Sequence, residues 1–302
     1  MSAAHKSDPA TVASLLVEAL PYIRRFSGQV VVIKYGGNAL ASSIDELGEP
    51  GGSAPVVGTL ATFAEDVVLL RSVGILPVVV HGGGPQIGEM MQRLGKAVEF
   101  RDGLRVTDAE TLDIARMVLV GKVNREIVST INIHAPLAVG LSGEDAHLIT
   151  AEQRSAQLGF VGDILRVDPT MVTSLLSQGL IPVVATVGIG AAGQAYNINA
   201  DTAAGAIAAA LGAEKLVYLT DVLGVQADRD DPSTLIGRIA AAEVEGMIKR
   251  RVVDGGMIPK LEAAAQAVKE GVGAAHVLDG TVPHALLVEL FTDAGLGTMV
   301  HQ

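Results

Sequence analysis

The chain has 302 residues, 49% of them hydrophobic but only 3% aromatic, and it contains neither cysteine nor tryptophan. This length suits one large domain or two lobes, and the lack of cysteine excludes disulfides and thiolate metal sites. A formal net charge of −11 argues against non-specific binding to nucleic acid or to an anionic membrane surface. No apolar run approaches the ~20 residues that span a bilayer, and no signal-peptide pattern is present, so we expect a soluble, cytoplasmic protein.

The first half of the chain alternates between predicted helices and strands. Pro21 should kink or divide the first helix, and Thr107 with Glu110 forms a capping box for the long one. In chain order, the pattern predicts a helix at 11–26, a strand at 29–34, an exposed loop or hairpin at 41–58, a helix at 59–73, a strand at 75–80, a helix at 85–94, a long helix at 107–132 and a strand at 137–141.

The second half continues the alternation. Asp201 is expected to cap an alanine-rich helix that ends near Gly212. The remaining predicted elements are a helix at 169–178, an apolar strand within 180–187, a strand at 215–220, a helix around 240–250, a helix at 259–270 and a strand at 275–278. Strands that alternate with helices predict an α/β fold, with a parallel sheet covered on both faces.

A lysine and two glycines follow the first strand. Val30 to Ile33 has the β-branched content of a buried parallel strand, and Lys34 stands at its carboxyl end, where open α/β sheets bind ligands. Gly36 and Gly37 leave backbone N–H groups open to an anion. The segment fits a phosphate site, although a lysine that lies along apolar surface beside an ordinary turn fits it equally well.

The same arrangement returns at residues 75–85, where an apolar strand ends in Gly82, Gly83 and Gly84. Pro85 suits the first turn of the helix that follows, and the positive end of that helix favours anions. Two such turns in one chain indicate a site for anionic ligands. His81, just before the glycines, is interpreted as a core or turn histidine rather than as a catalytic base.

A third glycine-rich segment matches a different motif. Gly188-Ile-Gly190-Ala-Ala-Gly193 follows an apolar strand, as in the dinucleotide fingerprint, and Glu214 stands about 20 residues further on. In that fold the glycines open a helix directly, whereas here 194–199 intervenes with the alternation of a strand. We interpret the glycines as a hairpin turn, which leaves a Rossmann dehydrogenase as the rival. The P-loop pattern does not occur.

Two polar groupings precede helices in the second half. Asn197, Asn199 and Asp201 alternate along the chain and would share one face, where they could bind a ligand or simply cap the helix. Asp254-Gly-Gly-Met-Ile-Pro-Lys260 places a glycine pair and a lysine at another helix start. Lysine is disfavoured at the positive end of a helix, so the position of Lys260 suggests that an anion lies between its ammonium group and the helix end.

With these segments assembled, the chain closely resembles the amino-acid kinase family. The resemblance runs from near residue 10 to the C-terminus, and its motifs are Lys34-Tyr-Gly-Gly, His81-Gly-Gly-Gly-Pro85, Gly103-Leu-Arg105-Val-Thr, Asn197-Ile-Asn-Ala-Asp201, Thr220-Asp-Val-Leu-Gly224-Val and Gly255-Gly-Met-Ile-Pro-Lys260. It implies an αβα sandwich around an open, mainly parallel sheet. It also implies transfer of a phosphoryl group from ATP to the side-chain carboxylate of N-acetyl-L-glutamate, a step of arginine biosynthesis.

The resemblance implies roles for individual residues. Lys34 and Lys260 would flank the transferring phosphoryl group and Asp201 would hold both lysines. The residues expected to bind the substrate are Gly83, Gly84, Arg105, which would clamp the α-carboxylate, and Asn197. Those expected to bind phosphate or nucleotide are Gly36, Gly37, Asp221, Val222, Leu223, Gly224, Val225, Gly255 and Gly256. The attacking carboxylate is ionised at neutral pH and needs no general base. Mg²⁺ would be held mainly by the phosphates of ATP, since no carboxylate cage is apparent and no residue is assigned as a metal ligand.

The resemblance also implies a division of the chain and a form of regulation. Residues 1–28 would form a kinked helix with an oligomerisation or regulatory role, 29–195 the lobe that binds the acyl substrate, and 196–302 the lobe that binds the nucleotide. An added N-terminal helix resembles the arginine-inhibited, hexameric members, which are trimers of dimers. L-Arginine would contact Tyr22, Lys215, Glu289 and Gly295. The alternative for the C-terminal run from His284 to Thr298 is an amphipathic segment that only covers the sheet edge.

Other functions are compatible with the same motifs. A sister kinase that acts on aspartate, glutamate, carbamate or a nucleoside monophosphate would keep the glycine turns and the lysines. Aspartate and glutamate kinases commonly carry extra C-terminal domains, for which 302 residues leave little room. A catalytically silent sensor would keep the fold but lose a lysine or Asp201, and none of these is missing.

Overall fold

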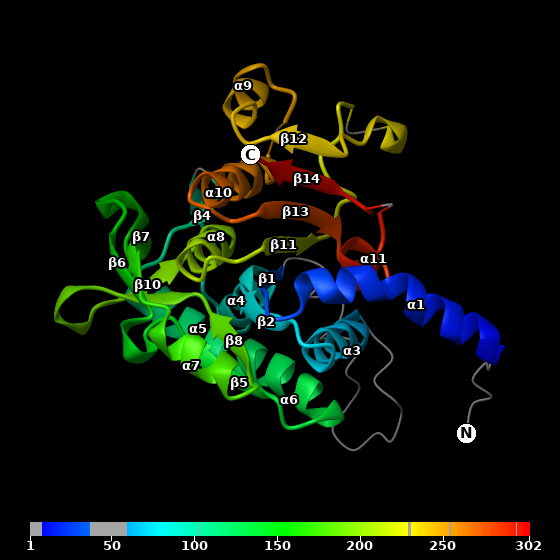
Figure 1. The fold of residues 1–302 in the computed structure, drawn as a ribbon. Coiled ribbons are helices and arrows are strands. Elements are labelled where there is room, and N and C mark those ends of the chain that lie inside the picture. The colour runs from blue at the N-terminus through cyan, green and yellow to red at the C-terminus, as the bar shows by residue number, and fades with distance from the viewer. Residues whose placement is uncertain (1–7, 37–58, 102, 229–230, 254, 294) are drawn as a thin grey trace.

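A computed structural model describes residues 8–36, 59–101, 103–228, 231–253, 255–293 and 295–302 (Figure 1). Its centre is an eight-stranded sheet in the order β12-β14-β13-β11-β1-β2-β8-β5. The strands are β1 (Val30–Tyr35), β2 (Leu76–His81), β5 (Ala138–Ser142), β8 (Ile181–Ala185), β11 (Lys215–Thr220), β12 (Arg238–Ala240), β13 (Ala274–Asp279) and β14 (Thr298–His301). All neighbours are parallel except β13 and β14, which confirms the prediction of a mainly parallel α/β sheet.

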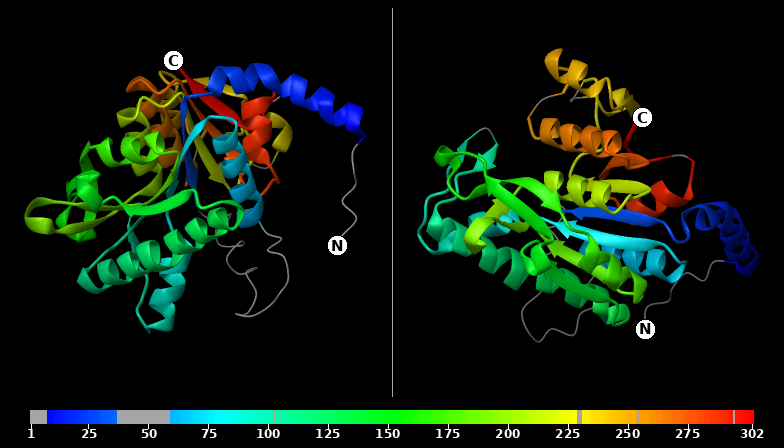
Figure 2. Two further views of the ribbon diagram at one scale, coloured as in Figure 1. Left: turned by 60° about the horizontal axis from the view of Figure 1, so that its bottom comes forward. Right: turned by 60° about the vertical axis from the view of Figure 1, so that its left-hand side comes forward.

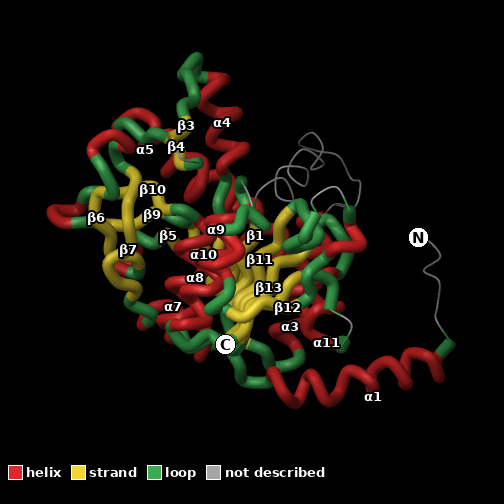
Figure 3. The backbone as a smooth tube through the Cα atoms, turned by 90° about the horizontal axis from the view of Figure 1, so that it is seen from above, coloured by secondary structure: helices red, strands yellow, loops and turns green. Residues whose placement is uncertain are grey.

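Helices cover both faces of this sheet, and the strands run between two helical layers (Figures 2 and 3). The helices that contribute to one core are α1 (Pro9–Phe26), α3 (Thr59–Ser72), α4 (Gly84–Arg93), α5 (Ala109–Arg116), α6 (Asn124–His134) and α11 (Ala285–Phe291). Those of the other core are α7 (Thr170–Ser177), α8 (Ala200–Ala210), α9 (Val244–Lys249) and α10 (Met257–Lys269). The result is the predicted αβα sandwich.

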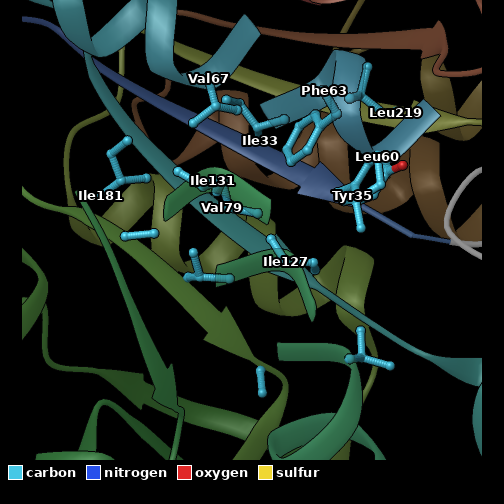
Figure 4. Close-up of a cluster of buried hydrophobic side chains, with 14 of the residues drawn as sticks. Ile33, Tyr35, Leu60, Phe63, Val67, Val79, Ile127, Ile131, Ile181 and Leu219 are labelled. Atoms are coloured by element: carbon cyan, nitrogen blue, oxygen red, sulfur yellow. The ribbon is translucent and has the colours of Figure 1, made fainter. Parts of the chain in front are cut away.

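Alternation along β1 decides which side chains face each layer. Ile33 and Tyr35 point into the core formed with α3 and α6, which Figure 4 shows in close-up, and the Tyr35 ring stacks on Phe63 at 4.2 Å between centroids. Val32 belongs to the opposite core, beneath α8. Lys34 follows this alternation and is therefore directed toward α8.

A small sheet lies beside the main one. Its strands, β6 (Ile149–Gln153), β7 (Val161–Val167), β9 (Val187–Ile189) and β10 (Ala195–Ile198), close on themselves, and β3 (Phe100–Arg101) pairs with β4 (Leu104–Arg105) in a separate hairpin. Because β10 pairs with β7 and β9, the proposed boundary between residues 195 and 196 would cut through a strand. A boundary just after β10 fits the structure better.

The β9–β10 hairpin decides between the two interpretations of the third glycine segment. Ala195 pairs antiparallel with Ile189, and Tyr196 with Gly188, so the glycines form the predicted hairpin turn. They do not open a helix, which removes the main argument for a Rossmann dehydrogenase.

Several predicted boundaries are wrong for local reasons. Pro21 lies inside the continuous helix α1 and does not divide it, while the alternative of a kink there stays a prediction. The predicted long helix contains a π-helical segment, Met117–Val123, between α5 and α6. Asp108 rather than Thr107 caps α5, because its carboxylate accepts a hydrogen bond from Thr111 N. Asn199 rather than Asp201 caps α8 in the same way.

The sequence patterns also missed several strands, namely β3, β4, β6, β7, β12 and β14. The predicted loop at 41–58 lies outside the described residues. No helix within the described part of the chain has both the length and the apolar run needed to cross a bilayer.

Candidate active site

Two lysines from distant parts of the chain meet at one carboxylate. Lys34, in β1, places Nζ 2.9 Å from Oδ1 of Asp201 as an ion pair. Lys260, in the first turn of α10, donates a hydrogen bond of 2.9 Å to Oδ2 of the same carboxylate. Lys34 and Asp201 are buried, with 5% and 6% of their surfaces exposed. The structure therefore brings together the three residues predicted to be catalytic.

The start of α8 sets the position of the carboxylate. Asn199 Oδ1 accepts hydrogen bonds from the backbone N–H groups of Asp201 and Thr202, which fixes the first turn of the helix. Tyr218, in the neighbouring strand β11, donates a hydrogen bond to Asp201 O at 3.1 Å. The Asp201 side chain thus extends from a helix start that is tied at two points.

Burial and charge act in opposite directions on this cluster. Burial alone would raise the pKa of the Asp201 carboxyl, but the ammonium groups of Lys34 and Lys260 outweigh it and hold the pKa below its ordinary value. Burial lowers the pKa of Lys34, and the nearby charge of Lys260 adds to this, while Asp201 opposes it. Asp201 therefore keeps two like charges close together, which their mutual repulsion would otherwise prevent.

Two glycine turns border the lysine cluster. A Cβ added to Gly36 would lie 3.4 Å from Lys34 Nζ and 3.6 Å from Gly82 N, and one added to Gly82 would lie 3.1 Å from the side chain of Ala200. Gly83 caps α4, and Gly84 is its first residue, so the positive end of that helix faces this region. Gly37 lies outside the described residues.

Arg105 is buried beside the second glycine turn. Its guanidinium donates a hydrogen bond of 2.8 Å to Gly84 O, contacts Met91 Sδ at 3.3 Å and lies 4.8 Å from the centroid of the Phe100 ring. Only 8% of Arg105 is exposed. The predicted substrate residues Gly83, Gly84 and Arg105 are therefore neighbours.

Thr107 connects Arg105 with Asn197, whereas the sequence pattern predicted a helix cap at this residue. Its hydroxyl donates to Arg105 O at 2.9 Å and accepts from Asn197 Nδ2 at 3.4 Å. Thr107 also pairs through its backbone with the segment around Gly159. The signal for this role was its place in the Gly-Leu-Arg-Val-Thr motif.

A cleft of about 540 Å³ opens on the other side of Lys260. Six of its lining residues were predicted for phosphate, nucleotide or catalysis, namely Asp221, Val222, Gly224, Val225, Gly256 and Lys260. The lining that sequence analysis missed includes Thr220, Gln226, Asp228, Arg251, Val253 and Met257. Leu223 and Gly255 adjoin this lining in sequence but are not part of it. The cleft has the size of a small-molecule site and contains both a cationic end and apolar walls.

A second buried cluster lies where α1, α11, β11 and β13 meet. Lys215 Nζ lies 2.8 Å from His276 Nε2, and Glu289 lies against the other ring nitrogen of His276. Burial would raise the pKa of Glu289, but the bond to His276 and the nearby charges lower it overall. Burial lowers the pKa values of Lys215 and His276. His276 was not predicted, because a histidine within an apolar strand gives no sequence signal.

The other two residues predicted to contact L-arginine, Gly295 and Tyr22, border this cluster. A Cβ on Gly295 would lie 3.6 Å from Glu289 Oε2, and the same carboxylate accepts a hydrogen bond from Leu296 N at 2.8 Å. Tyr22, in α1, interacts with Asp293, and a hydrogen bond between the two raises the pKa of the Tyr22 hydroxyl. The four predicted residues therefore gather at one end of the molecule, away from the lysine cluster.

Acidic and histidine side chains within the described residues do not form a group of three or more that could hold a metal ion.

The fold and these motifs define a kinase class, and the chain belongs to the amino-acid kinase family: the model of that family matches residues 29–279. Among curated relatives, the acetylglutamate kinase of Symbiobacterium thermophilum is 52% identical over 95% of this chain and 97% of its own length. The acetylglutamate kinase of Acidothermus cellulolyticus is 53% identical over 95% of this chain and 96% of its own.

Solved structures of N-acetylglutamate synthase from Neisseria gonorrhoeae are also similar. The complex with coenzyme A and N-acetyl-glutamate has a TM-score of 0.79 and 27% identity, covering 96% of this chain and 63% of the synthase chain. The complex with coenzyme A and L-arginine has a TM-score of 0.75 and 26% identity, covering 96% and 65%. This chain thus spans somewhat less than two thirds of the synthase.

Proposed function

We propose that this protein is an acetylglutamate kinase, which transfers the γ-phosphoryl group of ATP to the side-chain carboxylate of N-acetyl-L-glutamate and forms N-acetyl-L-glutamyl 5-phosphate in arginine biosynthesis. The observation that carries the proposal is the pair of ammonium groups on one buried carboxylate, between the glycine turns and the 540 Å³ cleft. The near-full-length relatives at about half identity are named for this activity.

The chemistry requires charge neutralisation more than proton transfer. The attacking oxygen belongs to an ionised carboxylate, so no residue has to remove a proton from it. Two anions must approach each other, and negative charge spreads over the equatorial oxygens of the transferring group. Lys34 and Lys260 supply fixed positive charge on both sides of that group, and Asp201 keeps them in place.

The remaining groups bind and orient the two substrates. Arg105 presents a guanidinium that suits bidentate recognition of the α-carboxylate, and Asn197 lies next to it through Thr107. Backbone N–H groups of Gly36 and Gly83 bind phosphoryl or carboxylate oxygens. ATP occupies the cleft lined by Asp221, Gly224 and Gly256, and Mg²⁺ is held mainly by its phosphates.

An assay of ADP release with several acceptors tests this function. We expect N-acetyl-L-glutamate to support turnover, and glutamate, aspartate, carbamate and UMP to support little or none. The matched control is Asp201→Asn, which keeps the shape of the side chain but not its charge. Preference for another acceptor would identify a sister kinase, and no turnover with any acceptor would favour a silent sensor.

The cluster around Glu289 supports feedback inhibition by L-arginine. Glu289 and the neighbouring His276 offer acceptors and charge to a guanidinium, and Tyr22, Lys215 and Gly295 lie around them. A solved neighbour of this chain was obtained with L-arginine bound. Titration of turnover with L-arginine should show inhibition that Glu289→Gln weakens and that Glu152→Gln, at an exposed position of β6, leaves unchanged.

Helix α1 supports assembly into a hexamer built as a trimer of dimers. It extends from the body of the protein (Figures 1 and 3) and carries a row of exposed apolar side chains, namely Val12, Leu15, Leu16, Val17 and Leu20. An apolar surface on an extended helix is typical of a subunit contact. We expect Leu16→Asp to convert the hexamer into dimers on gel filtration, and an unchanged hexamer would contradict this role for α1.

A further inference from the structure

A buried histidine that the proposed chemistry does not use lies behind the second glycine turn. His81, at the end of β2, is fully buried and shares its face of the sheet with Val79, which packs in the core of α3 and α6. Lys34 lies on the opposite face, toward α8. The turn that begins at Gly82 therefore has this histidine on one side and the lysine cluster on the other.

Asn124, the first residue of α6, fixes the state of one ring nitrogen. Its Nδ2 lies 2.9 Å from Val183 O and 3.0 Å from His81 Nε2, while its Oδ1 accepts a hydrogen bond from Arg125. The reversed amide would place oxygen against the Val183 carbonyl and NH₂ against the guanidinium, and both contacts are repulsive. Asn124 must therefore donate to Nε2, which makes Nε2 the unprotonated nitrogen.

The other ring nitrogen then carries the proton. Nδ1 lies 3.0 Å from Gly82 O, so His81 donates a hydrogen bond to that carbonyl. Burial lowers the pKa of His81 to about 4, against the effect of the Gly82 bond and with a contribution from Arg125, so the ring is neutral at physiological pH. Thr186 also donates a hydrogen bond to His81 O, which anchors the backbone from a third side.

The direction of the Gly82 carbonyl decides the direction of the next amide. In a planar trans peptide, the C=O and the following N–H point opposite ways. Holding Gly82 O against the imidazole therefore directs Gly83 N–H away from it, toward the face that carries Lys34. The turn is also packed tightly, since a Cβ on Gly83 would lie 2.9 Å from the Leu119 side chain.

We propose that His81, held in its Nδ1–H form by Asn124, is a positioning residue that aims the Gly83 N–H at the transferring phosphoryl group. The inference rests on the proposed kinase function. The imidazole never contacts a substrate and acts only through the peptide. If the peptide rotated, it would present the Gly82 oxygen to a phosphate, and that contact is repulsive.

Two substitutions test the role of the ring hydrogen bond. His81→Leu removes the donor, whereas His81→Asn keeps an N–H close to the position of Nδ1. We expect His81→Leu to lower kcat by about 10²-fold, the usual cost of losing one oxyanion donor, with little change in KM for ATP. His81→Asn should recover most of kcat. A folded His81→Leu enzyme with the kcat of the parent, or no recovery in His81→Asn, would overturn the proposal.

A spectroscopic measurement on the unsubstituted protein does not depend on how the variants fold. Proton-detected ¹⁵N spectra of labelled protein at neutral pH should show His81 protonated at Nδ1 and unprotonated at Nε2, with the ring signals assigned through their correlation to the His81 backbone. The Nε2–H form or an imidazolium would refute the inference. Because this spectrum needs no substrate, it is independent of the ADP-release assay, whose failure would count against the kinase function instead.

Discussion

Lys34 and Lys260 contact opposite oxygens of the same carboxylate, each at 2.9 Å, although one lies in the first strand and the other in a helix near the end of the chain. The Asp201 that joins them belongs to a third element, α8. Three separate elements must therefore be in place before the cluster exists, which ties the geometry of the site to the packing of the whole sheet.

The charge of this cluster predicts how its variants behave. Lys34→Ala, Lys260→Ala and Asp201→Asn should each lower kcat by about 10²-fold or more, because fixed charge at the phosphoryl group stabilises the transition state more than the ground state. The Michaelis constants should change much less. Steady-state kinetics check this, with Lys249→Ala as a control, since that lysine forms only an exposed pair with Glu245. Near-parental turnover in Lys34→Ala or Lys260→Ala would refute the assigned roles.

Arg105 is expected to act on substrate binding rather than on the chemical step. Arg105→Ala removes a buried guanidinium whose charged hydrogen bonds are worth about 1.5–3 kcal/mol, so KM for N-acetyl-L-glutamate should rise by roughly 10- to 100-fold. Initial rates measured against each substrate separately decide the matter. If only KM for ATP changed, the acyl substrate would have to lie elsewhere.

Residue patterns were sufficient for part of this site and insufficient for the rest. The two glycine turns and Lys34 could be predicted because open parallel sheets bind their ligands at the carboxyl ends of the strands. The meeting of Lys34 and Lys260 at the Asp201 carboxylate could not be derived from spacing, and only the family resemblance implied it. Thr107 was misassigned because the neighbouring Asp108 competes for the same helix start and wins. His276 was missed because only tertiary packing brings it to Lys215.

Short elements escaped prediction for a related reason. Strands such as β12 and β14 are three and four residues long, too short for their alternation to stand out from the surrounding loops. Their place in the sheet depends on long-range pairing, since β14 pairs with β13 and β12 pairs with β14, and local sequence does not report these partners. The core strands β1, β2 and β11 were found because their apolar runs are continuous and buried on both faces.

Gly159 is expected to affect binding of the acyl substrate through Thr107. Its φ of +67° is left-handed, and a Cβ there would lie 2.3 Å from Thr107 O. Gly159→Ala should therefore displace Thr107, raise KM for N-acetyl-L-glutamate and lower the melting temperature. The matched control is Gly95→Ala, with φ of +72° and no atom within 4 Å of the new Cβ, which carries only the backbone cost of about 1–2 kcal/mol. Equal effects of the two substitutions on KM would contradict this role.

The raised pKa of Asp66 leads us to expect a specific dependence of folding stability on pH. This buried carboxylate of α3 lies 2.5 Å from His284 Nδ1, and burial raises its pKa from 3.8 to about 6, against the effect of His284. The folded state therefore holds the proton more tightly than the unfolded state. The contribution of Asp66 to stability is greatest below pH 3.8 and falls as the pH rises to about 6, by about 3 kcal/mol in all.

Urea unfolding across this range, compared with Asp66→Asn, isolates the contribution of Asp66. Asparagine keeps an acceptor for His284 but has no proton to release in this window. The parent should lose stability relative to the variant as the pH rises toward 6, and the difference should then stay constant. Parallel stability curves for the two proteins would show that the Asp66 carboxyl titrates normally.

Arg251 offers a prediction in which stability and substrate binding change in opposite directions. It follows α9 with φ of +58°, and hydrogen bonds from its own N–H and from Val252 N–H to Ile248 O and Met247 O close the helix in the manner that favours glycine. The same residue lines the 540 Å³ cleft, where a cation would stabilise the phosphates of ATP. Arg251→Gly should therefore raise the melting temperature slightly while increasing KM for ATP several-fold.

Arg250→Gly is the control for this prediction. Arg250 has an ordinary helical conformation and does not line the cleft, so its loss should lower the melting temperature and leave KM for ATP unchanged. If Arg251→Gly bound ATP as well as the parent, Arg251 would have no role in nucleotide binding.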